Sequence, residues 1–218
     1  MIPAPASTVV LLRDAPAGLE VFMVRRHEQL AFMGGAYVFP GGRVDAADRG
    51  PRDPDGFRAA ALRELFEEGG VLLARDASGR ALSFVDASMR TRFQTYRRTV
   101  LDKTQAFREV LNREQLHLDL GALVLFAHWV TPPRLSRRFD TSFFAARAPE
   151  DQDALHDAGE TIESVWIAPG DALTRGDAGS MDLPPPTRHT LEGLSTFARA
   201  DAALAWYGER AAPRFEPQ

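Results

Sequence analysis

The sequence predicts an α/β fold, in which strands and helices alternate along the chain. Three observations lead to this fold class: short apolar β-branched runs, apolar positions at helical spacing, and Gly- or Pro-rich turns between them. With 218 residues, of which 44% are hydrophobic and 26% charged, the chain can bury a substantial core. We therefore expect one domain spanning residues 1–218.

The first part of the chain is expected to contain a hairpin, a short strand and a helix. Strands are predicted at Ser7–Leu12 and Val21–Arg26, joined by a Pro-Ala-Gly turn that favours a hairpin. A short strand at Ala36–Phe39 leads into a Pro-Gly-Gly turn. The spacing then predicts an amphipathic helix at Phe57–Glu68, and the apolar run Val71–Ala74 predicts another strand.

The second part is expected to begin with helices and return to strands. Residues 86–115 carry apolar positions at helical spacing with a break near Asp102, which predicts two helical pieces. The remaining expected elements are strands at Ala122–Val130, Thr141–Ala146 and Ser164–Ile167, a short helix at Asp171–Leu173, and a terminal helical region at 187–210.

The helix predicted at Phe57–Glu68 carries three carboxylates, Glu64, Glu67 and Glu68, at positions i, i+3 and i+4. On a helix this spacing puts all three on one face. Acids so close together repel each other, and a hard divalent cation such as Mg²⁺ relieves that repulsion. A solvated face is the commoner reason for acids on a helix, but the glycine turns on both sides favour a metal site here.

Residues 63–71 read R-E-L-F-E-E-G-G-V, and this run resembles the second half of the Nudix box, G-x5-E-x7-R-E-U-x-E-E-x-G-U, where U is aliphatic. The first half departs from the motif. Counting forward from Gly42 puts the box glutamate at Asp48, whereas counting back from Arg63 puts it at Asp55. The box therefore carries an insertion, and either aspartate is a candidate for the place of the glutamate.

The chain also resembles the branch of the Nudix family that contains the mammalian peroxisomal coenzyme A diphosphatase, whose box carries an insertion too. The resemblance rests on the F-P-G-G run with the residues before it, on Arg138–Phe144 and on Glu160–Trp166, and it covers positions 6–195. It implies the Nudix fold, a mixed β-sheet sandwiched between helices, with residues 86–115 as an extra helical insertion.

The resemblance implies a metal-dependent hydrolase that cleaves the diphosphate linkage of a nucleoside diphosphate joined to another moiety, with coenzyme A or acyl-coenzyme A as the first candidates. Mg²⁺ or Mn²⁺ would be the cofactor. The expected metal ligands are the Gly42 carbonyl, Glu64, Glu67 and Glu68. Glu64 is also a candidate general base, as are Glu160 and Glu163, and Arg63 is expected to orient a carboxylate.

Substrate contacts are expected from Arg26, Arg43 and Arg138, since arginine pairs well with phosphates, and from Phe139 by stacking on adenine. A sequence pattern common ahead of the box in coenzyme A enzymes is incomplete, because Ala31 stands where its second arginine would be. An ADP-ribose or NADH-type dinucleotide pyrophosphatase therefore remains an alternative. A ligand-sensing Nudix domain without turnover is a second alternative.

Composition excludes several other classes. The net charge of −4 argues against a nucleic-acid partner, and the lack of cysteine excludes disulfides and thiolate sites. We expect no membrane span, since no apolar run approaches ~20 residues. The N-terminus lacks the pattern of a signal peptide, and the C-terminus that of a peroxisomal address. We expect a cytoplasmic enzyme with a small-molecule nucleotide diphosphate as its partner; a homodimer stays open.

Overall fold

A mixed β-sheet forms the centre of the computed structural model, which describes residues 2–30, 33–157 and 159–216. The strands are β1 (Ala4–Ala15), β2 (Gly18–Arg26), β3 (Tyr37–Val38), β4 (Gly41–Arg43), β7 (Val124–Val130), β8 (Phe139–Arg147), β9 (Thr161–Ile167) and β10 (Arg214–Phe215). Their order is β10-β7-β8-β1-β2-β3, while β4 pairs with β1 and β9 pairs with β2. The predicted hairpin is β1–β2.

Strand β1 organises the sheet because it has partners on both edges. Along one edge it runs parallel to β8, from Ala4 opposite Phe139 onward. Along the other edge its second half is antiparallel to β2, and its first half is antiparallel to β4, with Ser7 opposite Gly42. Val9–Leu12 are fully buried, as expected for a central strand covered on both faces. Pairing with β4 brings the glycine turn onto the sheet.

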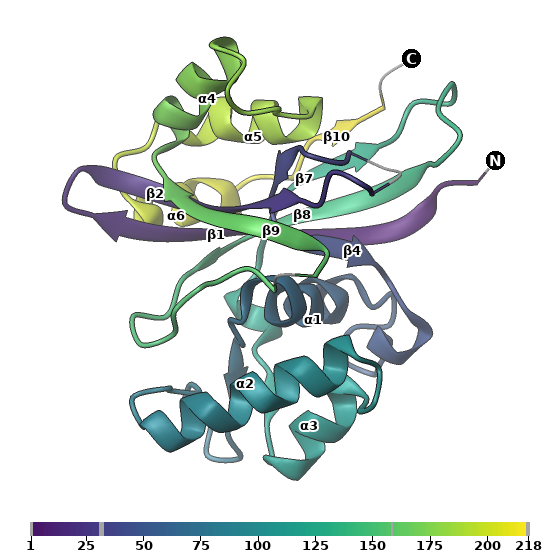
Figure 1. Ribbon diagram of the computed structural model, residues 1–218, viewed down its shortest axis with the longest axis vertical. Coiled ribbons are helices and arrows are strands. Elements are labelled where there is room, and N and C mark those ends of the chain that lie inside the picture. Colours follow the sequence, from purple (N-terminus) through teal and green to yellow (C-terminus); the bar gives the residue numbers. More distant parts are fainter. Residues whose placement is uncertain (1, 31–32, 158, 217–218) are drawn as a thin grey trace.

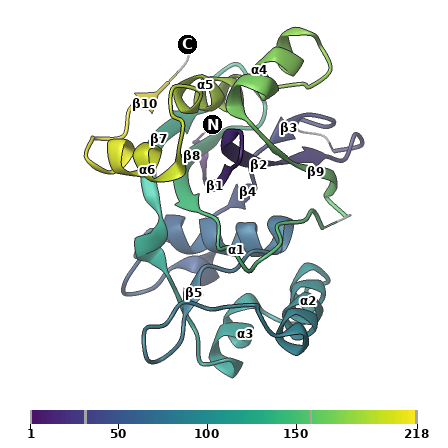
Figure 2. The same ribbon diagram turned by 90° about the vertical axis from the view of Figure 1, so that its left-hand side faces the viewer.

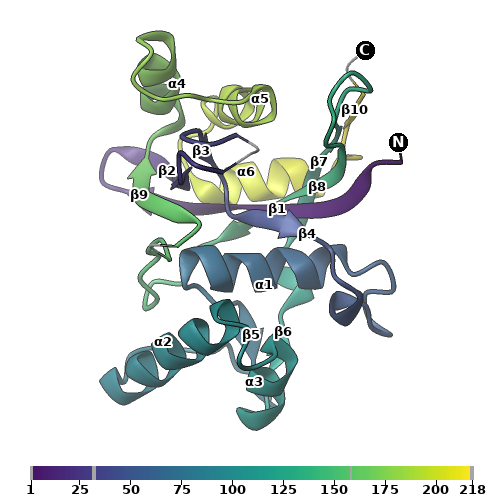
Figure 3. The ribbon, with the colours of Figure 1, turned by 45° about the vertical axis from the view of Figure 1, so that its right-hand side comes forward.

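Helices cover both faces of this sheet (Figure 1). They are α1 (Phe57–Gly69), α2 (Ala87–Leu101), α3 (Phe107–Arg113), α4 (Pro169–Asp177), α5 (Pro185–Leu194) and α6 (Ala200–Gly208), with 3₁₀ turns η1 (Ala46–Asp48) and η2 (Leu120–Ala122). Helix α1 lies on one face, and α4, α5 and α6 lie on the other (Figures 1 and 3). The α/β class and the sheet between helices are confirmed.

The predicted helical region 86–115 forms the separate helices α2 and α3, which lie beyond α1 on the side away from the sheet (Figures 1 and 2). The terminal region 187–210 is likewise two helices, α5 and α6. Three apolar clusters join these layers. One lies between the sheet and α4–α6, one between the sheet and α1, and one between α1 and α2–α3. In the third, Phe66 of α1 packs on Phe107 of α3.

The strand predicted at Val71–Ala74 is wrong. Only Ala74 and Arg75 form a strand, β5 (Ala74–Arg75), and its partner is the short β6 (His117–Leu118), outside the main sheet. Leu72 is fully buried without a ladder partner, and the side chain of Gln152 takes that role. The Leu72 amide donates to Gln152 Oε1 at 2.8 Å, and Gln152 Nε2 donates to the Leu72 carbonyl at 3.1 Å. The side-chain amide of Gln152 therefore provides the backbone hydrogen bonds of Leu72 that a neighbouring strand would provide in a sheet.

Strands β4 and β10 were not expected from the sequence, because two or three residues leave no periodicity to read. Among the described residues, none of the helices has the length and apolar character needed to cross a membrane.

Candidate functional site

Helix α1 carries the acidic cluster, and its ends are fixed by local sequence. Gly56 precedes it at φ 76°, and the Asp53 carboxylate accepts a hydrogen bond from the Ala59 amide at 2.8 Å. That bond satisfies a first-turn amide that has no partner within the helix. Gly70 ends the helix at φ 71°, where its amide donates to the Phe66 carbonyl at 3.0 Å. The glycine turn that the sequence places after the helix is therefore present.

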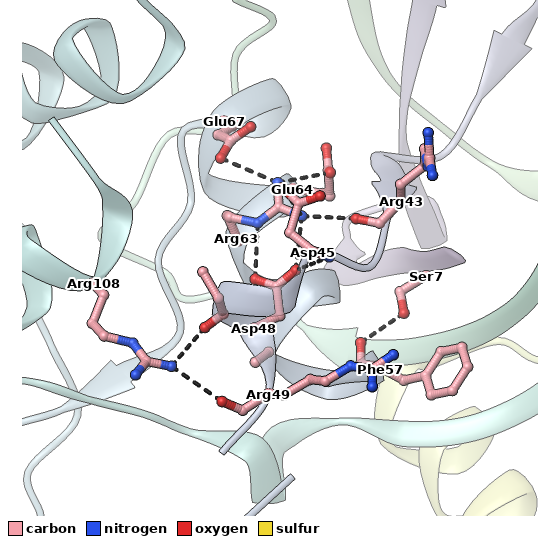
Figure 4. Close-up of polar contacts among 12 residues, drawn as sticks. Ser7, Arg43, Asp45, Asp48, Arg49, Phe57, Arg63, Glu64, Glu67 and Arg108 are labelled. Atoms are coloured by element: carbon pink, nitrogen blue, oxygen red, sulfur yellow. Dashed lines mark hydrogen bonds and ion pairs between the residues drawn. The ribbon is translucent and has the colours of Figure 1, made fainter. Parts of the chain in front are cut away.

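Arg63 connects the parts of the candidate site (Figure 4). Its Nε and Nη2 donate to the two oxygens of Asp48 at 2.9 and 3.0 Å, a bidentate pair. Its Nη1 donates to Glu64 at 2.8 Å and to Glu67 at 3.3 Å, and Nη2 also donates to the Arg43 carbonyl at 2.8 Å. Burial alone would lower the pKa of Arg63, but these carboxylates raise it, so the guanidinium stays charged.

The structure distinguishes the two aspartates that the sequence left open. Asp48 lies on η1 with only 5% of its side chain exposed, paired with Arg63, and it also accepts from the Asp45 amide at 2.8 Å. Asp55 lies in the turn before α1 and is exposed. Asp48 is therefore the one that contacts the acidic helix through its arginine.

The glycine turn lies directly against the carboxylates. The Gly41 amide donates to Glu68 Oε2 at 2.9 Å, and Glu68 is buried. A methyl group on Gly42 would lie 2.6 Å from Glu64 Cδ, closer than real contacts allow. Gly42 is thus needed for the close approach of β4 to α1, and Gly41 for its approach to β1, because a methyl group on Gly41 would lie 2.5 Å from the Ser7 carbonyl oxygen.

The three helix carboxylates are held in conditions that disfavour their charge. Burial raises the pKa of Glu68 to about 8, with a further increase from the neighbouring Glu64, against the hydrogen bond from Gly41. Burial raises the pKa of Glu64 to about 7, even though Arg63 opposes the shift. Burial also raises the pKa of Glu67. Arg63 therefore does not fully compensate the negative charge of the three carboxylates. This is what we expect of a site that binds a further positive charge.

The donor set suits a hard divalent cation, because carboxylates are its preferred ligands. Within the described ranges, no three acidic or histidine side chains are arranged so that they could hold a metal ion as they stand. In this arrangement Arg63 occupies one oxygen of Glu64 and one of Glu67. A cation bound by these residues would have to compete with Arg63 for them.

The two later acids that were candidate bases lie in different places. The charge of Glu160 raises the pKa of both Glu64 and Glu68, and Glu160 lines a cavity together with Glu67. Glu163 is instead held by Tyr37, whose hydroxyl donates to its carboxylate at 2.9 Å on the β2–β3 side of the sheet. The structure thus brings Glu160, rather than Glu163, to the cluster.

The expected substrate residues are spread over three places. Arg26, at the end of β2, is near enough for its charge to oppose the raised pKa of Glu68. Arg43 contacts Arg63 through its carbonyl, and its side chain is exposed and points away (Figure 4). Arg138 and Phe139 lie where β8 begins, next to the start of β1. Ala31, which marks the incomplete coenzyme A pattern, lies outside the described residues.

The sequence analysis missed Arg97 of α2. Its Nε donates to the Glu67 carbonyl at 2.8 Å, so it closes the C-terminal end of α1, where a positive charge is favourable. Burial lowers the pKa of Arg97, while the charges of Asp157 and Glu68 oppose this shift. The sequence feature that could have pointed to Arg97 is its position beside the apolar face of α2, where Phe93 and Tyr96 are buried.

Comparison with known proteins gives one family. The family model of the NUDT19 Nudix domain matches residues 51–194. The chain is similar to acyl-coenzyme A diphosphatase NUDT19 of Homo sapiens, 28% identical over 240 residues, and of Gallus gallus, 27% identical over 253 residues. These alignments cover 85% and 90% of this chain, but only 63% and 66% of the human and chicken proteins. The chain thus spans about two thirds or less of these relatives.

A solved structure agrees over nearly the whole chain. The crystal structure of a NUDIX hydrolase from Alicyclobacillus acidocaldarius is 30% identical, with a TM-score of 0.80, and the match covers 94% of this chain and 96% of that one. The NUDIX domain of Shewanella oneidensis NrtR, complexed with ADP ribose, has a TM-score of 0.53 at 13% identity, which shows a shared fold alone.

Proposed function

Because the chain belongs to the Nudix hydrolase family, we propose that it cleaves the diphosphate linkage of a nucleoside diphosphate joined to another moiety, and that coenzyme A or its acyl thioesters are the substrates. The single observation that carries the reaction type is the cluster of Glu64, Glu67 and Glu68, of which Glu68 is buried, against the glycine turn. The name of the relatives, acyl-coenzyme A diphosphatase, supports the substrate class.

Nudix hydrolases generally use divalent metal ions, and we propose that Mg²⁺ or Mn²⁺ serves here. The Gly42 carbonyl and the carboxylates of Glu64, Glu67 and Glu68 would hold it, as their burial and raised pKa values favour. When bound, the cation would neutralise charge on the diphosphate and acidify a water molecule.

The remaining roles belong to side chains around the cluster. Asp48 takes the place of the box glutamate, since it holds Arg63 by two hydrogen bonds. Arg63 in turn keeps Glu64 and Glu67 on the same side of α1. Glu160 is the proposed general base, because its charge already acts on Glu64, and its carboxylate would accept a proton from the attacking water.

Further side chains are proposed to bind the substrate. We propose that Arg26 contacts a phosphate of the substrate, since its charge already acts on Glu68. We propose that Arg43, Arg138, Phe139 and Glu163 contact other parts of the substrate. We also propose that residues 1–218 form one domain and that the protein is cytoplasmic.

The test is hydrolysis of a small panel with Mg²⁺ or Mn²⁺: coenzyme A, an acyl-coenzyme A, ADP-ribose, NADH and a diadenosine polyphosphate. Products are identified by mass. We expect 3′,5′-ADP and the 4′-phosphopantetheine product from wild type, none from Glu68→Gln, and normal amounts from the exposed control Glu209→Gln. Turnover of ADP-ribose or NADH alone would refute the coenzyme A assignment. Tight binding without turnover would favour a sensing domain instead.

A further inference from the structure

A cavity of about 860 Å³ opens beside the carboxylate cluster, on the side of α1 away from the sheet. One wall is the loop at residues 45–53, which overlaps the box insertion at 48–55, and the second is α1, which contributes Arg63 and Glu67. The third wall comes from residues 100–118, which include α3 and the end of α2. The cavity therefore begins at two residues of the candidate site and extends toward the helical insertion.

The wall formed by the helical insertion is mainly apolar. Val100, Phe107, Leu111 and Leu116 line it and belong to the apolar cluster under α1. The ring of Phe107 packs on Phe66 with centroids 5.6 Å apart, so it is engaged in the core. A mostly aliphatic wall of this kind suits a flexible hydrocarbon chain better than a second nucleotide base, which is bound by stacking on an open aromatic face.

Polar groups are placed along the same cavity. The amide side chains of Gln105 and Asn112 lie on its walls, and the exposed cations Arg49, Arg52 and Lys103 lie around it. Amides can exchange hydrogen bonds with amide groups of a ligand, while the cations favour its anionic end. The cavity thus combines a charged entrance at Glu67 with amide and aliphatic surfaces.

The cavity is held in shape by contacts between its walls. Arg108 of α3 donates to the carbonyls of Ala47 at 2.6 Å and Arg49 at 3.2 Å, which joins the loop at residues 45–53 to the helical insertion. Within the box insertion, Gly50 and Asp53 exchange two backbone hydrogen bonds at 3.1 Å. Such preformed concave sites are typical of ligand pockets, whose volumes run from about 300 to 1,000 Å³.

We propose that this cavity binds the non-nucleotide arm of the substrate, an amide-containing chain that ends in an aliphatic acyl group. The inference rests on the proposed function, because the diphosphate of that substrate would lie at Glu67 and Arg63, where the cavity begins. The box insertion and α2–α3 then select the arm, while α1 and the glycine turn act on the diphosphate.

A binding experiment tests the cavity without any turnover. The probe is S-dodecanoyl pantetheine, which carries the amides and the chain but no diphosphate, and its binding is measured by calorimetry. Ala106 is exposed on the cavity wall just before α3, so Ala106→Trp would fill the cavity from a surface position. The matched control is Ala202→Trp, an exposed alanine of α6. We expect wild type and Ala202→Trp to bind the probe with equal affinity. Ala106→Trp should bind it at least about tenfold more weakly, because the indole would keep a few methylenes of the probe out of the cavity.

Kinetics with intact substrates distinguishes this inference from the proposed function. The KM of acyl-coenzyme A should fall by up to about fourfold per added methylene until the cavity is filled. Ala106→Trp should raise the KM for dodecanoyl-coenzyme A at least about tenfold, and by more than it raises the KM for coenzyme A, whose arm lacks the acyl chain. Turnover that is indifferent to chain length, or equal probe binding by Ala106→Trp, would overturn the inference and leave the proposed function standing. Failure to turn over any coenzyme A species would overturn the proposed function itself.

Discussion

The pair formed by Asp48 and Arg63 gives the sharpest test of the site, because Asp55 provides a matched control. Asp48→Asn keeps the shape of the side chain and removes its charge. The two side chains are only 5% and 11% exposed, so the ion pair is largely shielded from water. Removing one partner of a buried ion pair typically costs ~3–5 kcal/mol.

The cost here should lie below that range, because Arg63 keeps its contacts with Glu64 and Glu67. We expect Asp48→Asn to lower the free energy of unfolding by about 2–3 kcal/mol. For a protein of this size each kcal/mol corresponds to about 2–4 °C, so Tm should fall by roughly 4–12 °C. Asp55→Asn should change the free energy of unfolding by less than about 0.5 kcal/mol, since that side chain is exposed.

Urea unfolding followed by circular dichroism measures the free energy of unfolding, and hydrolysis of coenzyme A under saturating Mg²⁺ measures the activity, which should also fall in Asp48→Asn. Asp48→Glu, which restores the charge, should recover part of the stability and part of the activity. Equal stability of the Asp48→Asn and Asp55→Asn proteins would refute the assignment of Asp48 to the place of the box glutamate.

Three further predictions follow from the same contacts. Gly42→Ala should reduce turnover at least about tenfold by displacing Glu64, whereas Gly170→Ala, with open space around it, should leave it unchanged; steady-state kinetics of both proteins checks this. Burial raises the pKa of Asp157, but hydrogen bonds from Thr161 and the backbone outweigh it and hold this pKa below its ordinary value. The stabilisation by the Asp157 carboxylate is therefore complete above pH about 4 and is lost as the pH falls through its folded-state pKa. The free energy of unfolding of Asp157→Asn should consequently fall less between pH about 5 and 3 than that of wild type. Urea titrations over this pH range measure the difference. Chelation should abolish hydrolysis and Mg²⁺ or Mn²⁺ should restore it; full activity in excess chelator would contradict metal dependence.

Local sequence predicted the acidic helix almost to the residue, from Phe57 to Glu68 against an observed end at Gly69. The reason is that capping, periodicity and the glycine stop are all encoded within one short segment. The strand predicted at Val71–Ala74 failed because a distant side chain, Gln152, supplies its hydrogen bonds. A pattern of apolar residues indicates that a segment is buried, but it does not indicate which group forms hydrogen bonds with its backbone.

The candidate site shows the same division. The three glutamates of α1 were readable from spacing alone, because neighbours on one helix face are fixed by its pitch. The choice between Asp48 and Asp55 depended on how the box insertion folds back to Arg63, which spacing does not encode. Arg97 was missed for a related reason, since its contact with α1 joins two helices across a tertiary interface.

The hydrogen bonds from Arg108 to the carbonyls of Ala47 and Arg49 join two segments of the chain, the loop at residues 45–53 and helix α3. Each segment supplies the other with a contact, so a change in one should disturb the other. In protein engineering they should therefore be exchanged as one cassette. A chimera that receives only α3 would contain Arg108 without its two carbonyl acceptors. A chimera that receives only the loop would lack the hydrogen bonds from Arg108.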